Sequence, residues 1–201
     1  MSALRRQRQA ERRGETVDGP AGPGRAAALR VIEALLWAGV AVLFVLRVAP
    51  QVRAAVGWKP AGTAAPAVTL DMLEGGAVPL GALKGQVVLV NFWATWCPPC
   101  RAEMPGLESL YEAKHAAGFT VVGVSLDEKA PPEVAAFLYD HHIAYPVAMA
   151  TPEVVAAFGG VSSLPTSYLI DRNGRVRYTV QGMFAGVALR AALDRLLAER
   201  G

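Results

Sequence analysis

The sequence has only two cysteines and three histidines in 201 residues. A structural zinc site needs four such ligands, and neither a second Cys-X-X-Cys pair nor a metal-type His-X-X-X-His spacing is present. Covalent c-type haem needs a histidine directly after the second cysteine, where this chain has Arg101. The scarcity of ligands argues against both kinds of site, and we expect no bound metal.

Acidic residues are scarce in residues 1–59, which carry ten Lys or Arg against four Asp or Glu. Residues 60–201 carry ten against thirteen. The formal net charge of +3 therefore comes from the N-terminal segment, and the remainder is mildly acidic. Because that remainder has no basic stripe with interleaved aromatic residues, we expect no nucleic-acid partner.

The apolar run near the N-terminus is short for a membrane-spanning helix, which needs about 20 mostly apolar residues. Ala34–Leu46 is uncharged, and extension to Arg30 and Arg47 adds only Glu33. The two flanking arginines would lengthen the effective span by reaching to the interfaces. Seven arginines up to Arg30 face only three acids, so the positive-inside rule places the N-terminus in the cytoplasm.

These features predict a single-pass protein of the cell inner membrane with its folded domain on the periplasmic side. A cleaved signal peptide is the alternative, because small residues surround Thr63. The basic leader is longer than signal peptides usually have, which favours an uncleaved anchor. The predicted organisation is a cytoplasmic, basic, disordered tail over 1–29, a transmembrane anchor over 30–48, a linker over 49–65 and a folded domain over 66–201.

Strand and helix signals alternate in the folded domain. Residues 86–93 and 119–127 are continuous apolar runs rich in β-branched side chains, typical of strands buried on both faces. Hairpins are expected around Gly75–Gly76 and Asn173–Gly174. Helices are expected over 98–117, 131–140, 152–158 and 185–200, and Thr151 is the expected N-cap of the third. This order predicts an α/β fold in which helices cover both sides of a mixed sheet.

The two cysteines, Cys97 and Cys100, lie directly after a buried strand and at the start of a helix. A purely structural disulfide is possible outside the cytoplasm, yet a four-residue loop closes little chain entropy. A helix N-terminus favours a thiolate on Cys97. Cys100 lies one turn further on, where it can resolve a mixed disulfide. Thiol–disulfide exchange is therefore the favoured chemistry.

The sequence FWATWCPPC, Pro105 five residues after the second cysteine, and Leu164-Pro165-Thr166 before a strand resemble the thioredoxin superfamily. The N-terminal hairpin, LKGQVVLVNFWATWCPPCRAEMP, the insertion around 127–160 and LPTSYLIDRNGRV resemble its TlpA/ResA-like membrane-anchored oxidoreductases, relatives of the cytochrome c maturation reductases. The resemblance covers residues 64–200. It implies a thioredoxin-like fold with an extra N-terminal β-hairpin, and no cofactor besides the redox-active Cys97–Cys100 disulfide.

The resemblance also implies a site and partners. Cys97 would attack a substrate disulfide, and Cys100 would resolve the product. Pro165 matches the family's cis-proline, which faces the cysteines. The implied substrate groove comprises Trp96, Pro98, Pro99, Leu164, Pro165 and Thr166. The implied partners are disulfide-bearing proteins, such as apocytochrome c or a copper-site assembly protein, and a membrane thiol electron donor.

The two prolines indicate the direction of electron flow. Pro98 and Pro99 have no N–H, so the amides that would point at the Cys97 sulfur are missing. The donors left are those of Cys100 and Arg101. A weakly stabilised thiolate means a low reduction potential, and we therefore expect a disulfide reductase.

Two further positions bear on the thiols. Asn91 stands where thioredoxins proper place a buried Asp, and Glu103 matches an acid of the ResA-like group. A carboxylate three residues after Cys100 lies on the same helix face. There it would raise the thiol pKa values and relay the proton of Cys100. A solvated surface position for Glu103 stays an equal alternative.

Two other functions remain open. A thiol peroxidase of the AhpC/TSA-like kind needs a proline and a threonine spaced before its reactive cysteine. Here Thr95 is only two residues ahead, and no proline stands in the preceding strand. A copper-binding metallochaperone module would need a third ligand. Met104 and Met183 exist, but nothing in the sequence brings them to the cysteines.

Overall fold

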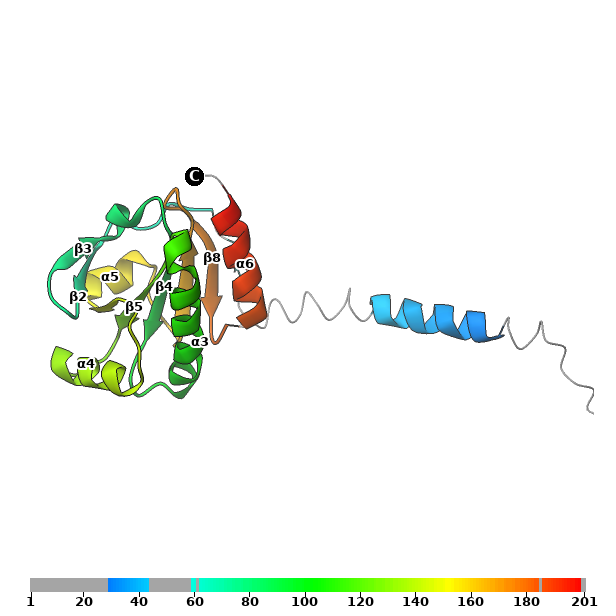
Figure 1. Cartoon of the computed structure of the whole chain (residues 1–201), viewed down its shortest axis with the longest axis horizontal. Coiled ribbons are helices and arrows are strands. Elements are labelled where there is room, and N and C mark those ends of the chain that lie inside the picture. Colours follow the sequence, from blue (N-terminus) through cyan, green and yellow to red (C-terminus); the bar gives the residue numbers. More distant parts are fainter. Residues whose placement is uncertain (1–28, 44–58, 61, 185, 200–201) are drawn as a thin grey trace, which may run out of the picture. The chain divides into compact units, whose positions relative to one another are not determined.

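The computed structural model describes residues 29–43, 59–60, 62–184 and 186–199 of the chain (Figure 1). The chain divides into two compact units, residues 1–49 and residues 50–201.

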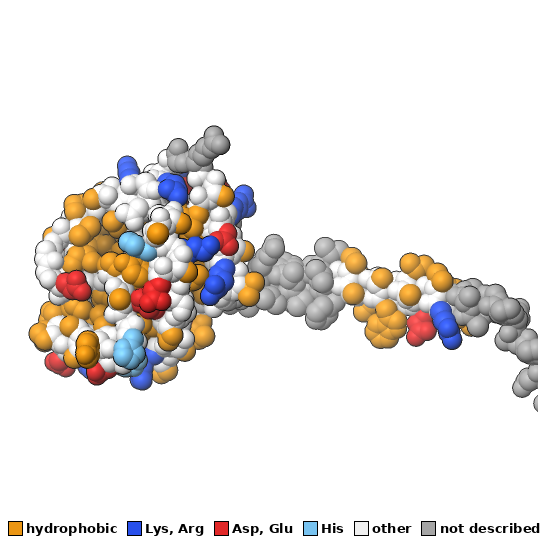
Figure 2. Space-filling model, viewed as in Figure 1, with side chains coloured by type: hydrophobic (Ala, Val, Ile, Leu, Met, Phe, Trp, Pro, Cys, Tyr) orange, Lys and Arg blue, Asp and Glu red, His pale blue; other side chains and the backbone are white. Residues whose placement is uncertain are grey.

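In the first unit, residues 29–43 form a helix whose side chains are exposed. Figure 2 shows apolar side chains along both visible edges of this helix. Among the described residues, no helix is long and apolar enough to cross a membrane. The predicted tail up to residue 28 and residues 44–48 of the predicted anchor lie outside the described residues.

The second unit is built on one eight-stranded mixed sheet in the order β1-β8-β7-β4-β5-β6-β2-β3. Its central strand β4 (Val87–Trp93) pairs in parallel with β5 (Phe119–Ser125) and antiparallel with β7 (Thr166–Ile170). The other strands are β1 (Lys59–Pro60), β2 (Thr69–Met72), β3 (Ala77–Pro79), β6 (Val147–Met149) and β8 (Val176–Gln181). The predicted mixed sheet and the predicted Gly75–Gly76 hairpin between β2 and β3 are confirmed.

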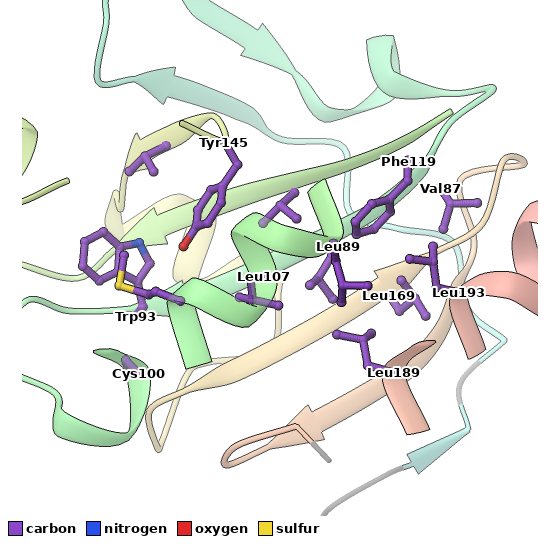
Figure 3. Close-up of a cluster of buried hydrophobic side chains, with 14 of the residues drawn as sticks. Val87, Leu89, Trp93, Cys100, Leu107, Phe119, Tyr145, Leu169, Leu189 and Leu193 are labelled. Carbon is purple, nitrogen blue, oxygen red and sulfur yellow. The ribbon is translucent and has the colours of Figure 1, made fainter. Parts of the chain in front are cut away.

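Strand β4 is buried along its whole length, and its alternating side chains face two separate cores. Val87 and Leu89 pack on the side of α3 (Pro98–Lys114) and α6 (Gly186–Ala198), as Figure 3 shows. Val90 packs on the opposite side, toward α5 (Pro152–Ala157). The same alternation turns Asn91 toward α3, on the face that carries the cysteines.

The remaining helices are α4 (Pro131–Asp140), which joins the core on the α3 side, and two 3₁₀ helices, Leu80–Leu83 and His115–Ala117. The predicted N-cap of α5 is confirmed, because the Thr151 hydroxyl accepts a hydrogen bond from the Val154 N–H at 3.3 Å. Such a cap satisfies one of the amides that a helix start leaves free.

Lys59–Pro60, which fall in the predicted linker over 49–65, form β1 and pair with the edge of β8. The two residues have no strand pattern of their own, and they become a strand because they pair with the edge of β8. The helix predicted over 98–117 is confirmed: it is an α-helix to Lys114 and a 3₁₀ helix over His115–Ala117.

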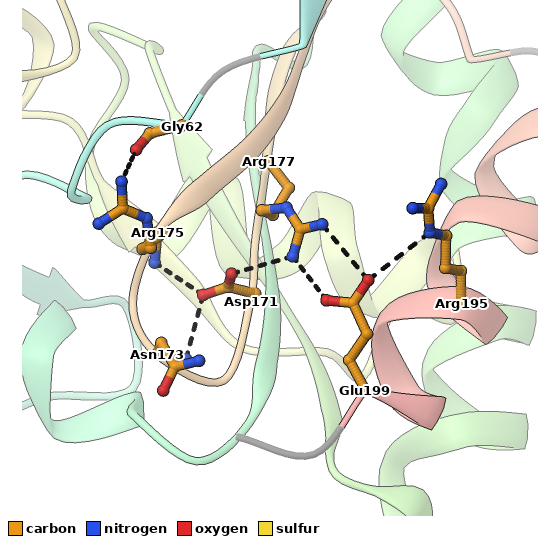
Figure 4. A network of polar contacts seen from close by, with 7 residues as sticks. All are labelled: Gly62, Asp171, Asn173, Arg175, Arg177, Arg195 and Glu199. Carbon is orange, nitrogen blue, oxygen red and sulfur yellow. Dashed lines mark hydrogen bonds and ion pairs between the residues drawn. The ribbon is translucent and has the colours of Figure 1, made fainter.

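The turn between β7 and β8 is tied to the end of α6 by a polar network (Figure 4). The buried carboxylate of Asp171 accepts hydrogen bonds from the backbone N–H groups of Asn173 and Arg175 and from the Arg177 side chain. Arg177 also donates to Glu199, and this hydrogen bond lowers the pKa of Glu199. The network lies at the opposite end of β7 from Thr166, and so away from the cysteines.

Candidate active site

The carboxyl end of β4 leads directly into the cysteine pair. Cys97 is the N-cap residue of α3, and Pro98 and Pro99 occupy the first two helical positions. Cys97 and Cys100 form a disulfide with an S–S distance of 2.06 Å. Cys97 exposes 4% of its surface and Cys100 none, so only Cys97 is open to an attacking or leaving sulfur.

Among the described residues, one backbone amide reaches the Cys97 sulfur. The N–H of Cys100 donates to the Cys97 Sγ at 3.3 Å. The Arg101 N–H, predicted to be a second donor, instead donates to the Cys97 carbonyl oxygen at 3.1 Å, and that prediction is wrong. An N-cap side chain accepts from the second or third helical amide. The second position here is Pro99, which leaves Cys100 as the donor. An amide at the first position, Pro98, would not reach the sulfur, so only Pro99 removes a donor, and the expectation for both prolines is wrong.

Glu103 is buried one helical turn after Cys100, with 9% of its surface exposed. Its Oε1 accepts a hydrogen bond from Asn91 Nδ2 at 2.8 Å, and its Oε2 accepts from the Phe184 N–H at 3.4 Å. Burial raises the pKa of Glu103 to about 7, although these two hydrogen bonds oppose the shift. The alternative of a solvated surface glutamate is therefore wrong.

The charge of Glu103 acts on a buried phenol nearby. Burial raises the pKa of the Tyr145 phenol above its ordinary value, and the charges of Glu103 and Glu108 raise it further. The Tyr145 hydroxyl and the Trp93 Nε1 have no hydrogen-bond partner among the described residues. Both side chains are drawn in Figure 3.

A surface groove runs beside Cys97, and no charged side chain of the described residues lines it. Trp96 exposes 65% of its surface, the Leu164–Pro165 peptide bond is cis as predicted, and Leu164 lines the groove. Pro165 and Thr166 do not line it; Thr166 is buried and its hydroxyl donates to the Ser163 carbonyl oxygen at 2.7 Å. The lining comprises Trp96, Cys97, Pro98, Pro99, Leu126, Val161, Ser162, Ser163 and Leu164.

Sequence reasoning missed the second wall of the groove and the carboxylate beside it. Leu126 and Val161–Ser163 come from loops with no distinctive motif. Asp127 is buried and accepts hydrogen bonds from Thr95 and Ser125. The only available signal was an acid directly after a buried apolar run, at the carboxyl end of a strand next to β4.

Among the described residues, no group of three or more Cys, His, Asp or Glu side chains is placed to hold a metal ion.

Comparison with known proteins gives the family. The model of the Redoxin family matches residues 60–193. The chain belongs to the Redoxin family. This chain is 37% identical over 115 residues to the thiol-disulfide oxidoreductase ResA of Bacillus anthracis. The match covers 57% of this chain and 66% of that relative. With ResA of Bacillus cereus it shares 37% identity over 137 residues, 67% of this chain and 78% of the relative.

A solved structure agrees with the fold of the Redoxin-family chain. It is that of a putative thiol:disulfide interchange protein DsbE from Chlorobium tepidum, with 34% identity and a TM-score of 0.64. The match covers 69% of this chain and 98% of that one. The α/β fold is thus thioredoxin-like, and the ResA-like relatives together with the Cys97–Cys100 disulfide support an oxidoreductase activity.

The buried Glu103 predicts a pH-dependent stability. Because its folded-state pKa of about 7 lies above the unfolded value of 4.5, its contribution is fully present below pH 4.5 and is lost as pH rises through 7. Glu103→Gln keeps the acceptor for Asn91 but removes the charge. As pH rises from about 4.5 to about 8, the free energy of unfolding of the wild type should fall by about 3 kcal/mol relative to that of this variant.

Urea unfolding of the disulfide form at the two pH values measures this difference. Glu112→Gln, on the exposed side of the same helix, controls for the general effect of removing a negative charge. If wild type and Glu103→Gln lose stability in parallel as pH rises, the buried carboxylate is not the cause.

Proposed function

We propose that this protein is an extracytoplasmic disulfide reductase that acts on protein substrates. The observation that carries the proposal is the pairing of a sparsely stabilised Cys97 sulfur with a buried acid, Glu103, one helical turn after Cys100. The first feature makes the reduced pair a good electron donor. The second supplies a proton acceptor for the resolving step.

In the reduced protein, the Cys97 thiolate attacks one sulfur of a substrate disulfide, forms a mixed disulfide and releases the first substrate thiolate. The Glu103 carboxylate takes the proton of the Cys100 thiol. The resulting Cys100 thiolate attacks the Cys97 sulfur and expels the second substrate thiolate. Two electrons have then passed to the substrate, and the Cys97–Cys100 disulfide has formed. A pKa near 7 suits Glu103 to this step, because it can take up and release a proton near neutral pH.

The proposed direction rests on thiolate stability. A disulfide is strongly oxidising when its reduced form is stabilised. Here one amide reaches the Cys97 sulfur, and the nearby Glu103 carboxylate opposes a further negative charge. Both effects disfavour the thiolate, so the pair tends to give up electrons. A membrane thiol donor would return the oxidised pair to the dithiol, and the disulfide is the only redox group that the scheme requires.

The extracytoplasmic location is supported by the arginine-rich segment that precedes the apolar helix over residues 29–43. An anchor over residues 30–48 would hold the redox domain outside the inner membrane, where protein disulfides form and persist. The uncharged groove beside Cys97 suits an extended protein segment around a disulfide. By family resemblance, the substrate would be apocytochrome c or a copper-site assembly protein.

Trapping tests the proposed function. Cys100→Ser lacks the resolving thiol, so the mixed disulfide between Cys97 and its substrate should accumulate when the full-length variant is produced in its native compartment. Non-reducing electrophoresis and mass spectrometry identify the adduct. Cys97→Ser, which lacks the attacking thiol, should trap nothing. A folded Cys100→Ser variant that forms no adduct would contradict substrate exchange through Cys97.

Restoring one helix-start amide should make the pair more oxidising. Pro99→Ala places an N–H at the second helical position, from which it can donate to the Cys97 sulfur. One additional hydrogen bond worth about 1.4 kcal/mol corresponds to a rise of about 30 mV in reduction potential. Pro98→Ala is the matched control, because an amide at the first position does not reach the N-cap side chain. Equal shifts in the two variants would sink the single-donor explanation.

A further inference from the structure

A buried carboxylate joins two segments next to the cysteines. Asp127 exposes 8% of its surface. Its Oδ1 accepts from the Thr95 hydroxyl at 2.6 Å, and its Oδ2 accepts from the Thr95 N–H at 2.9 Å and from the Ser125 hydroxyl at 2.7 Å. Both oxygens are thus used by donors from two segments. In all three contacts the Asp127 carboxylate is the acceptor.

The two joined segments carry the groove. Thr95 immediately precedes Trp96 and Cys97, and Asp127 immediately follows Leu126; all three neighbours line the groove. The parallel pairing of β4 and β5 ends at Trp93 and Ser125 and continues in one further hydrogen bond, from the Leu126 N–H to the Trp93 carbonyl oxygen at 2.8 Å. Beyond this point, Asp127 joins the two segments by accepting two hydrogen bonds from Thr95.

The segment that Asp127 holds includes a strongly exposed aromatic side chain. Trp96 exposes 65% of its surface, and an exposed tryptophan in an uncharged groove is a typical anchor for a protein partner. Fixing such an anchor before binding lowers the entropic cost of association. A small disulfide is too short to fill the groove, so its reaction depends on the Cys97 sulfur. The two kinds of substrate therefore differ in what they require from this loop.

We propose that Asp127 is a positioning residue for protein capture: its carboxylate holds Trp96 and Leu126 in a fixed arrangement beside Cys97. The proposal rests on the proposed function, since it concerns the same groove. Asp127 takes no part in the sulfur chemistry. Its loss weakens the binding of protein disulfides and leaves the reaction of the cysteines with small disulfides intact.

Single-turnover kinetics test this role. The full-length protein is reduced, freed of reductant and mixed with excess insulin as a protein disulfide or with 2-hydroxyethyl disulfide as a small one. Remaining thiols are counted after acid quench and alkylation. Asp127→Asn keeps the shape of the side chain but turns an amide donor toward the Thr95 or Ser125 donors. The half-saturating insulin concentration should rise about tenfold, the effect of losing one charge-assisted hydrogen bond. The limiting rate and the rate with 2-hydroxyethyl disulfide should stay within about twofold.

Asp171→Asn is the matched control. It removes another buried carboxylate that accepts several hydrogen bonds, at the far end of β7, and it should change neither reaction. Thr95→Val removes one donor and keeps the carboxylate, so its effect on insulin should be smaller than that of Asp127→Asn. Should circular dichroism show that Asp127→Asn does not fold, Thr95→Val and Ser125→Ala decide the matter.

Equal slowing with both probes, or no change with either, would overturn the positioning role. A wild-type protein that reduces neither probe would contradict the proposed reductase function itself. The two failures are therefore distinguishable, because the first compares variants while the second concerns the wild type alone.

Discussion

The site depends on one hydrogen bond, from the Cys100 N–H to the Cys97 sulfur. A helix start normally offers several free amides, and here proline removes the one at position 99. The remaining amide belongs to the resolving cysteine itself. Stabilisation of the Cys97 thiolate is therefore weak. The one amide that provides it belongs to Cys100, the residue that must attack next. The direction of electron flow follows from this shortage of donors.

The sheet explains how a carboxylate can be buried on the same helix that begins at such a sulfur. Alternate side chains of β4 face α3, and at position 91 this face carries an amide instead of an apolar group. Asn91 donates to Glu103 and also to the Ser167 hydroxyl on β7, both at 2.8 Å. Burial makes the charged form of Glu103 costly, while the amide limits that cost. The result is an acid with a pKa of about 7 in the same core as the cysteines.

Much of this could be predicted from the sequence, because the signals are local. The buried strand before Cys97, the N-cap Thr151 and the cis bond at Pro165 each follow from a short motif or from family resemblance. The burial of Glu103 was left open, because helix periodicity does not show which neighbour covers a given face. Asp127 was missed, because its partners are 32 and 2 residues away and only strand pairing brings both to it. Edge strand β1 was missed for a similar reason, since its partner strand lies more than 100 residues further along the chain.

The most direct test of the central claim is the reduction potential of the Cys97–Cys100 pair. The full-length protein is equilibrated with thiol redox buffers of known potential at neutral pH, and the fraction of dithiol is read by alkylation and mass spectrometry. Weak thiolate stabilisation predicts a potential at or below that of thioredoxin, about −270 mV. A potential near that of DsbA, about −120 mV, would show a well-stabilised reduced form and would contradict the assignment as a reductase.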